Sequence, residues 1–259
     1  MAPPAAWLPR QHGAWAMLIV PFIVGTVLAC RAEVAGAWLI PLAAAELSAY
    51  FGFNTLTLFL RSPVSRRQNL HRPLITYSAL TAVLATLALV LGAWRLAWWL
   101  MVAAPLFFWA IRQTAHHRER DVSSGLATVA LASGVGLAIR FHSPGQILNE
   151  WPQAAPDLVV LCWMFAHFAG TVWHIKAMIR ERGLPRARRR TCTWHALVLA
   201  STALVLVQHL SLAWPVFFTI TLARTTWMTA PQRTTSFSAK QLGVTEIFLS
   251  LGVLAVALT

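Results

Sequence analysis

The sequence predicts an all-α fold, a polytopic membrane helix bundle with nine transmembrane helices that form one integral membrane domain over residues 1–259. Hydrophobic residues make up 58% of the chain and charged residues only 11%, whereas soluble domains carry about 25% charged residues. Alternating strand patterns are absent. Because lipid offers the backbone no hydrogen-bond partners, apolar stretches of this kind are expected to be helices.

Nine apolar stretches follow one another along the chain, each with about the 20 residues that a helix needs to cross a membrane. They cover residues 14–32, 36–60, 74–94, 96–112, 123–140, 156–179, 192–211, 213–231 and 241–258. The longest polar connections, 61–73 and 180–191, each follow an even-numbered span, four spans apart. This spacing predicts a two-repeat layout of two four-helix halves plus a ninth helix.

Basic residues gather in alternate connections. Of the 21 Lys and Arg residues, all but Arg31, Arg95 and Arg140 lie on one side of the predicted membrane. Since basic residues concentrate in cytoplasmic loops, the N-terminus is predicted to be cytoplasmic and the C-terminus outside. Omitting one span would break the alternation, so the charge pattern supports a count of nine.

The net charge of +13 is expected to face anionic lipid headgroups, so membrane lipids are predicted partners. No nucleic-acid-binding module accompanies the charge, and nucleic acid is excluded as a partner. Cys30, Cys162 and Cys192 are dispersed without metal-ligand spacing. With only eight acidic residues and no clustered carboxylates, the sequence predicts no metal and no cofactor.

Most tryptophans lie near the ends of the predicted spans, as in the aromatic belts that anchor membrane proteins at the lipid interface. The residues concerned are Trp7, Trp15, Trp38, Trp94, Trp98, Trp99, Trp151, Trp194, Trp214 and Trp227. They are interpreted as anchors and not as part of a ligand site.

Ionisable residues inside predicted spans are costly and usually functional. They are Glu46, His167, His174, Arg224 and Glu246, and His195 and His209 bracket the seventh span. His167 and His174 are seven residues apart and share a helix face with Thr171 between them. Glu181 continues this line towards the cytoplasm, so His174 and Glu181 are the candidate catalytic residues. The alternative is that the histidines only form hydrogen bonds between helices.

The candidate ligand-binding residues are polar groups on the cytoplasmic side. Arginine forks suit bidentate binding of phosphate or carboxylate, and a helix N-terminus beside a histidine can hold an anion. The candidates are His12, Asn54, Arg61, Arg72, Lys176, Arg180 and Arg182. The alternatives are a solvated basic loop after the second span and an ordinary interfacial entry at His12. The basic run 186–190 is interpreted as a lipid-facing patch without a site role.

Two segments carry a family resemblance. Residues 9–17, which include Gln11-His12-Gly13-Ala14-Trp15, read together with Arg180-Glu181-Arg182-Gly183, resemble the YwiC-like family of bacterial integral membrane proteins. The resemblance implies the bacterial cytoplasmic (inner) membrane and supplies no reaction.

The layout is more distantly similar to the UbiA superfamily of intramembrane prenyltransferases, which have nine helices and motif-bearing loops after helices 2 and 6. Asn54 and His71-Arg72-Pro73-Leu74 resemble the opening and closing residues of the first UbiA motif. Residues 55–61 lack the metal-binding aspartates of that motif. The resemblance therefore implies an anionic lipid or isoprenoid ligand that basic side chains of the protein bind directly, without Mg²⁺.

Three functions are compatible with these patterns. The first is an intramembrane lipid-handling enzyme with an acid–base residue beside a basic headgroup site. The second is a binding or transport protein for a small anion or a haem-like ligand, suggested by the nine histidines. The third is a non-catalytic membrane assembly factor that keeps a UbiA-like scaffold. The choice between the first and the third stays open, and no substrate is assigned.

Overall fold

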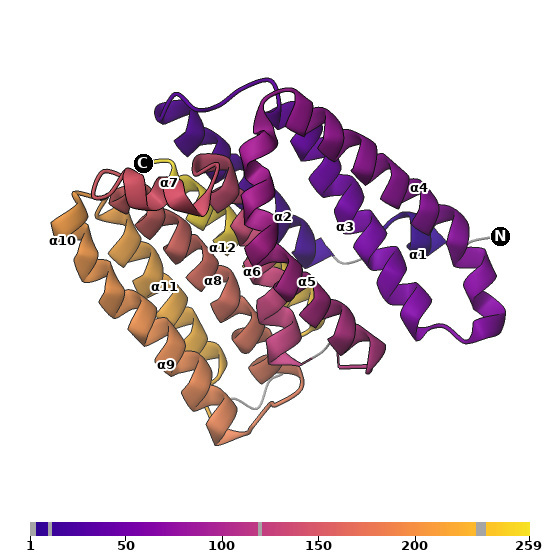
Figure 1. Ribbon diagram of the computed structural model, residues 1–259. Coiled ribbons are helices and arrows are strands. Elements are labelled where there is room, and N and C mark those ends of the chain that lie inside the picture. Colours follow the sequence, from indigo (N-terminus) through magenta and orange to yellow (C-terminus); the bar gives the residue numbers. More distant parts are fainter. Residues whose placement is uncertain (1–3, 10–11, 119–120, 232–236) are drawn as a thin grey trace. The chain divides into compact units, whose positions relative to one another are not determined.

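The computed structural model describes residues 4–9, 12–118, 121–231 and 237–259, and this part of the chain is helical without a strand (Figure 1). The predicted all-α class is thereby confirmed. Contacts between helices divide the chain into two compact units, Met1–Asn149 and Glu150–Thr259, called unit 1 and unit 2 below. The division falls after the fifth predicted span and not after the fourth.

The described residues of unit 1 form five long helices and three short ones. They are α1 (Pro4–Trp7), α2 (His12–Arg31), α3 (Leu39–Arg61), α4 (Val64–Val90), the 3-10 helix η1 (Ala93–Trp99), α5 (Leu100–Ala115), α6 (Val122–Arg140) and α7 (Pro144–Asn149). Helices α3 and α4 lie side by side, α2 packs on α6, and α5 packs on α6 (Figure 1). Thr55 of α3 and Tyr77 of α4 hold α1 by donating hydrogen bonds to the carbonyls of Ala6 (2.7 Å) and Trp7 (2.6 Å).

The prediction of a polar loop over residues 61–73 is wrong, because only Ser62 and Pro63 separate α3 from α4. Pro63 has a φ of −56°, which proline favours and which suits the entry to a helix. The basic residues that follow are good helix formers, and Leu70 and Pro73 are buried. The helix therefore begins ten residues before the predicted span.

Helices α2 and α6 approach at a pair of glycines. A Cβ atom added to Gly25 would lie 2.5 Å from the carbonyl oxygen of Gly136 and 2.6 Å from its Cα. Small residues permit such close backbone contact between membrane helices. The position of Gly25 therefore requires a residue without a side chain.

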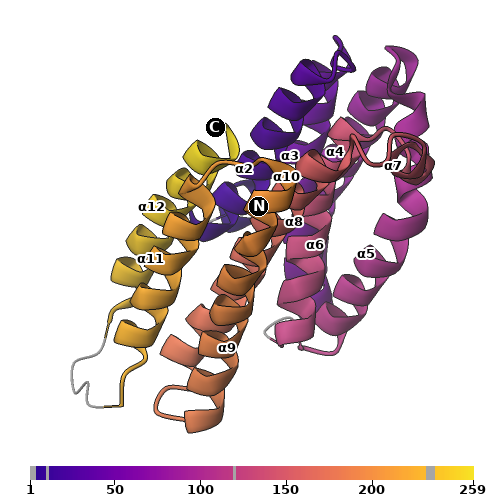
Figure 2. The same cartoon turned by 90° about the vertical axis from the view of Figure 1, so that its left-hand side faces the viewer.

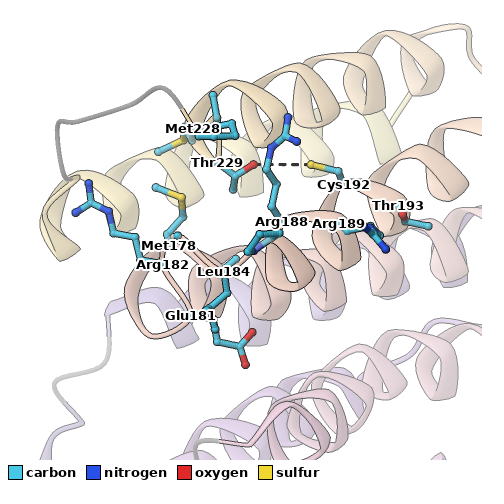
Figure 3. A pocket seen from close by; sticks show the side chains of 15 residues that line it. Met178, Glu181, Arg182, Leu184, Arg188, Arg189, Cys192, Thr193, Met228 and Thr229 are labelled. Carbon is cyan, nitrogen blue, oxygen red and sulfur yellow. Dashed lines mark hydrogen bonds between the residues drawn. The ribbon is translucent and has the colours of Figure 1, made fainter.

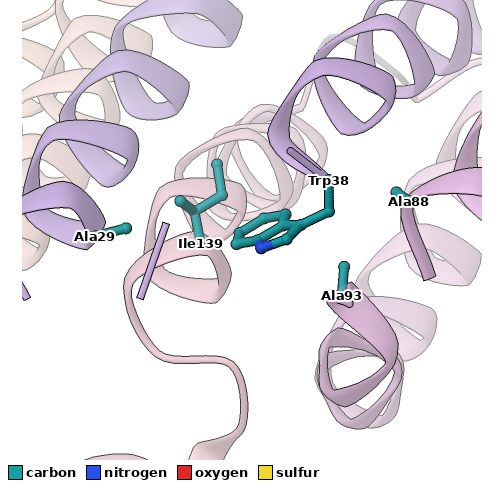
Figure 4. Close-up of a cluster of buried hydrophobic side chains, with 5 residues drawn as sticks. All are labelled: Ala29, Trp38, Ala88, Ala93 and Ile139. Atoms are coloured by element: carbon teal, nitrogen blue, oxygen red, sulfur yellow. The ribbon is translucent and has the colours of Figure 1, made fainter. Parts of the chain in front are cut away.

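A tryptophan occupies the core of unit 1 and not a lipid interface. Trp38 is 4% exposed and packs with Ala29, Ala88, Ala93 and Ile139 (Figure 4). The belt interpretation is wrong for this residue and also for Trp214 of unit 2, which is 1% exposed. Both sit near span ends in sequence, but neighbouring helices cover their rings.

Four long helices of unit 2 form a ring. They and two short elements are α8 (Ala155–Ile179), α9 (Pro185–Ser201), the 3-10 helix η2 (Thr202–Leu204), α10 (Val205–Gln208), α11 (Ala213–Met228) and α12 (Ala239–Ala257). Contacts run from α8 to α9, α9 to α11, α11 to α12 and α12 back to α8, and Figure 2 shows α9, α11 and α12 side by side. The interior of the ring is therefore bordered by all four helices.

The seventh predicted span, residues 192–211, has different bounds from α9, η2 and α10, the helices found in its place. Helix α9 begins at Pro185, seven residues before the predicted start, because proline suits the first helical turn and the following arginines favour helix. The predicted loop 180–191 thus shrinks to residues 180–184. At the other end, α9 ends at Ser201, and α10 ends at Gln208. The next residue, His209, has a φ of 52°.

Among the described residues, five helices are long and apolar enough to cross a membrane: Val64–Val90, Ala93–Ala115, Val122–Arg140, Ala155–Ile179 and Ala239–Ala257. Trp15–Arg31 is a shorter apolar helix. These helices are those of a multi-pass membrane protein. The remaining three predicted spans are shorter, as α11 is with 16 residues, or carry polar side chains such as Glu46 and Asn54 in α3.

Candidate functional site

The interior of unit 2 contains a buried ion pair. Arg224 of α11 donates from Nη1 to Oε1 of Glu246 of α12 at 2.7 Å, and the two side chains are only 10% and 9% exposed. Thr171 of α8 donates to Oε2 of the same glutamate at 2.9 Å. Both carboxylate oxygens of Glu246 are therefore held, and three helices meet at this one group.

Three histidines surround the ion pair. His167 and His174 of α8 and His195 of α9 are 3%, 0% and 5% exposed, and Arg224 lies within electrostatic range of each ring. The ion pair and the three histidines form what we call the polar centre of unit 2. Each helix of the ring supplies at least one ionisable residue to it.

The register of α8 against α9 follows from a glycine. A Cβ atom on Gly170 would lie 3.0 Å from Nε2 of His195, so only glycine lets this ring approach without displacement. The Nε1 of Trp194 donates to the carbonyl of Ala166 at 2.9 Å. The ring Nδ1 of His195 also lies 2.8 Å from the carbonyl of Thr191. These contacts fix the position of the His195 ring.

The two candidate catalytic residues, His174 and Glu181, do not share one helix face in the structure. His174 lies in the polar centre, and neither ring nitrogen has a hydrogen-bond partner among the described residues. Helix α8 ends at Ile179, so Glu181 does not continue its polar face as predicted. Glu181 lies in the turn that Gly183, with a φ of +79°, helps to close.

A pocket of about 440 Å³ opens beside this turn (Figure 3). Its walls come from the end of α8 with the turn 180–184, the first turns of α9, and the end of α11. Met178 and Met228 line it and also pack against Leu242. The pocket is therefore lined by charged side chains, called its rim, and by an apolar part around Met178 and Met228, called its floor.

Basic side chains dominate the rim. Glu181 pairs with Arg190 at 2.7 Å and with Lys176 at 3.6 Å. The pocket is also lined by Arg182, Arg188 and Arg189, for which no ion pair is found among the described residues. Glu181, the acidic side chain of the pocket lining, is thus already engaged with two cations.

The interpretation of residues 186–190 as a lipid-facing patch needs revision. Arg188 and Arg189 line the pocket, and Arg190 pairs with Glu181. Sequence reasoning missed them because a run of arginines does not show which of its members face inward once the run is helical. The helical spacing over residues 185–193 was the signal that could have distinguished the inward-facing arginines of this run from the others.

The other candidate ligand residues of unit 2 lie at the end of α8. Lys176 is held by Glu181, and Arg180 is exposed at the residue that follows the helix. In unit 1, Asn54 is half-buried in α3, and Arg61 and Arg72 are exposed in α3 and α4. His12 is the first residue of α2, and its side chain lies outside the described part.

Comparison with known proteins gives three findings. The family described as YwiC-like protein matches residues 8–140, which lie in unit 1. A protein of Bacillus subtilis (strain 168), named "Uncharacterized protein YwiC", is 28% identical over 177 residues, which are 68% of this chain and 69% of that protein. No solved structure matches the chain.

Proposed function

The chain belongs to the YwiC-like family, and we propose that it is a protein of the bacterial cytoplasmic membrane that binds an anionic amphiphile in the pocket of unit 2. The observation that carries the proposal is a set of three arginines, Arg182, Arg188 and Arg189, that line the pocket together with two methionines and for which no ion pair is found in the described part of the chain. A phosphate or carboxylate headgroup would meet the arginines, and the hydrocarbon chain would meet the floor.

The physical chemistry of the pocket favours this ligand class over others. Guanidinium groups bind phosphate and carboxylate with two parallel hydrogen bonds, and three of them together would not be neutralised by a single nearby carboxylate. The volume lies within the range of small-molecule sites. Methionine adapts to irregular apolar groups, which suits an isoprenoid or acyl chain.

The proposed roles of the remaining candidates follow from their contacts. Glu181 holds Lys176 and Arg190, so we propose that it positions these cations at the rim. His174 precedes Met178 by one helical turn on α8, and we propose it as the candidate for proton transfer. Asn54, Arg61, Arg72 and His12 stay predicted ligand residues of unit 1.

Lipid retention by the purified protein tests the proposal. Native mass spectrometry in detergent should detect bound phosphatidylglycerol or added farnesyl phosphate on the wild type. Replacing Arg182, Arg188 and Arg189 together by glutamine should reduce the bound fraction at least tenfold. Arg186→Gln is the matched control, because this exposed arginine of the same helix does not line the pocket. Equal retention by the triple variant and the wild type would refute the proposal.

The finer topology is also part of the proposal: nine crossings, with the N-terminus cytoplasmic and the C-terminus outside. The distribution of basic residues supports it. Single cysteines at Ser62 and Gly183, in a variant with Cys30, Cys162 and Cys192 replaced by serine, should react with a membrane-impermeant maleimide only in inverted vesicles. A cysteine at Ser143 should react in intact cells. The opposite pattern would reverse the orientation.

A further inference from the structure

Arg224 keeps one edge of its guanidinium group without a partner. Nη1 donates to Glu246, whereas Nε and Nη2 are buried and make no hydrogen bond among the described residues. Nε and Nη2 point to the same side of the planar group, and together they form the fork that holds two oxygens of a carboxylate. The ion pair therefore leaves a complete bidentate donor inside unit 2.

The histidines of α8, which lie within electrostatic range of Arg224, offer further buried polar atoms. Nε2 of His167 and both ring nitrogens of His174 are buried and lack hydrogen bonds within the described chain. Protein interiors rarely leave polar atoms in this state, because a buried group loses its hydrogen bonds to water without replacement. Five such atoms on Arg224 and two neighbouring rings, inside one ring of helices, indicate a site for a polar ligand.

We propose that the polar centre of unit 2 binds a small oxyanion of the carboxylate class, such as formate, acetate or bicarbonate, on the Nε–Nη2 edge of Arg224. His167 and His174 supply the additional hydrogen bonds. This site is separate from the amphiphile pocket, because Arg224 does not line that pocket. It does not depend on the function proposed above.

Charge balance adds a second feature to this site. The groups that face it are His167 and His174 of α8, His195 of α9, Arg224 of α11 and Glu246 of α12. The arginine and the glutamate already neutralise each other, so a bound anion would leave one net negative charge in an apolar interior. Since an uncompensated buried charge is very costly, one proton should enter with the anion and reside on a histidine.

Titration of the protein in lipid nanodiscs with acetate and with ¹³C-formate tests the site. Arg224→Lys keeps the positive charge beside Glu246 but loses the fork, and it should weaken binding at least tenfold. Arg186→Gln removes an exposed arginine of α9 that does not line the amphiphile pocket, and this variant should bind as the wild type does. Wild-type affinity should rise about tenfold for each unit by which the pH falls, if one proton is taken up, and His174→Gln should reduce this dependence.

Three outcomes would overturn the inference. The first is that neither acetate nor formate binds to the wild type. The second is that the wild type and Arg224→Lys have equal affinities. The third is a loss of binding in Arg186→Gln. The unfolding temperature of Arg224→Lys is measured in parallel. If that variant unfolds, His174→Gln decides the question, because an affinity and pH dependence identical to those of the wild type would contradict the site.

Discussion

Of the candidate spans in the described residues, the most buried lies in unit 2 and the two least buried lie in unit 1. In α8 of unit 2, 56% of the most apolar stretch is buried, against 11% for α4 and 6% for the η1–α5 segment of unit 1. Helix α8 is enclosed and carries two histidines and Thr171 on its buried face, whereas α4 and α5 expose leucine, valine and phenylalanine side chains. The comparison teaches that ionisable residues are concentrated where neighbouring helices shield them.

Different interactions stabilise the interior of each unit. Unit 1 relies on close glycine contact between α2 and α6 and on the cluster around Trp38, with a hydrogen bond between the hydroxyls of Ser48 and Thr81 at 2.7 Å. Unit 2 relies on a buried ion pair that ties three helices together. Substitutions in unit 2 should therefore reveal electrostatic costs, and those in unit 1 steric costs.

The largest effect is expected from Glu246→Ala. Removing one partner of a buried ion pair leaves Arg224 uncompensated, which costs about 3–5 kcal/mol. The change should appear as a marked fall in the unfolding temperature of the purified protein. Arg118→Ala is the control, because its contact with Asp121 in unit 1 is long (3.9 Å) and exposed and should contribute little. Equal effects of the two substitutions would contradict the role of burial.

Gly25→Ala tests the steric contact of unit 1. The added methyl group would overlap with Gly136 and separate α2 from α6, at a cost of about 1–3 kcal/mol. Gly134→Ala is matched to it, because nothing lies within 4 Å of a Cβ atom at that position of α6. That control should be neutral or slightly stabilising. Thermal unfolding of both variants measures the difference, and a neutral Gly25→Ala would refute the close contact.

Thr171→Val separates the hydrogen bond from the charge. Valine keeps the size of threonine but cannot donate a hydrogen bond to Glu246. The free energy of unfolding should therefore fall by about 1.5 kcal/mol. The measurement is the midpoint of unfolding in a denaturing detergent. An unchanged midpoint would show that Arg224 alone satisfies the carboxylate.

The smallest effect is expected from Ser48→Ala in unit 1. It removes the hydrogen bond between the neutral hydroxyl groups of Ser48 and Thr81. Hydrogen bonds of this kind contribute about 0.6 kcal/mol to the stability of membrane helix bundles. The same detergent unfolding assay should place it below Thr171→Val. The reverse order would break the contrast between a neutral bond in unit 1 and a charge-assisted bond in unit 2.

Part of the candidate site was accessible from sequence. His167, Thr171 and His174 share one helix face by their spacing alone, and the structure places all three inside unit 2. Arg224 and Glu246 were identified as ionisable residues within spans, but their pairing was not predicted. Opposite charges in two consecutive spans were the available signal, although spacing along the chain does not show which helix faces meet.

The sequence by itself determined the helical class, the multi-pass membrane character and the family, because hydropathy, composition and short motifs depend on consecutive residues. Only the tertiary structure decided that Trp38 is a core residue, that Glu181 leaves the polar face of α8, and that Arg188 and Arg189 line a pocket. The physical reason is the same in each case. Burial and charge compensation depend on side chains from other helices, and no local pattern contains that information.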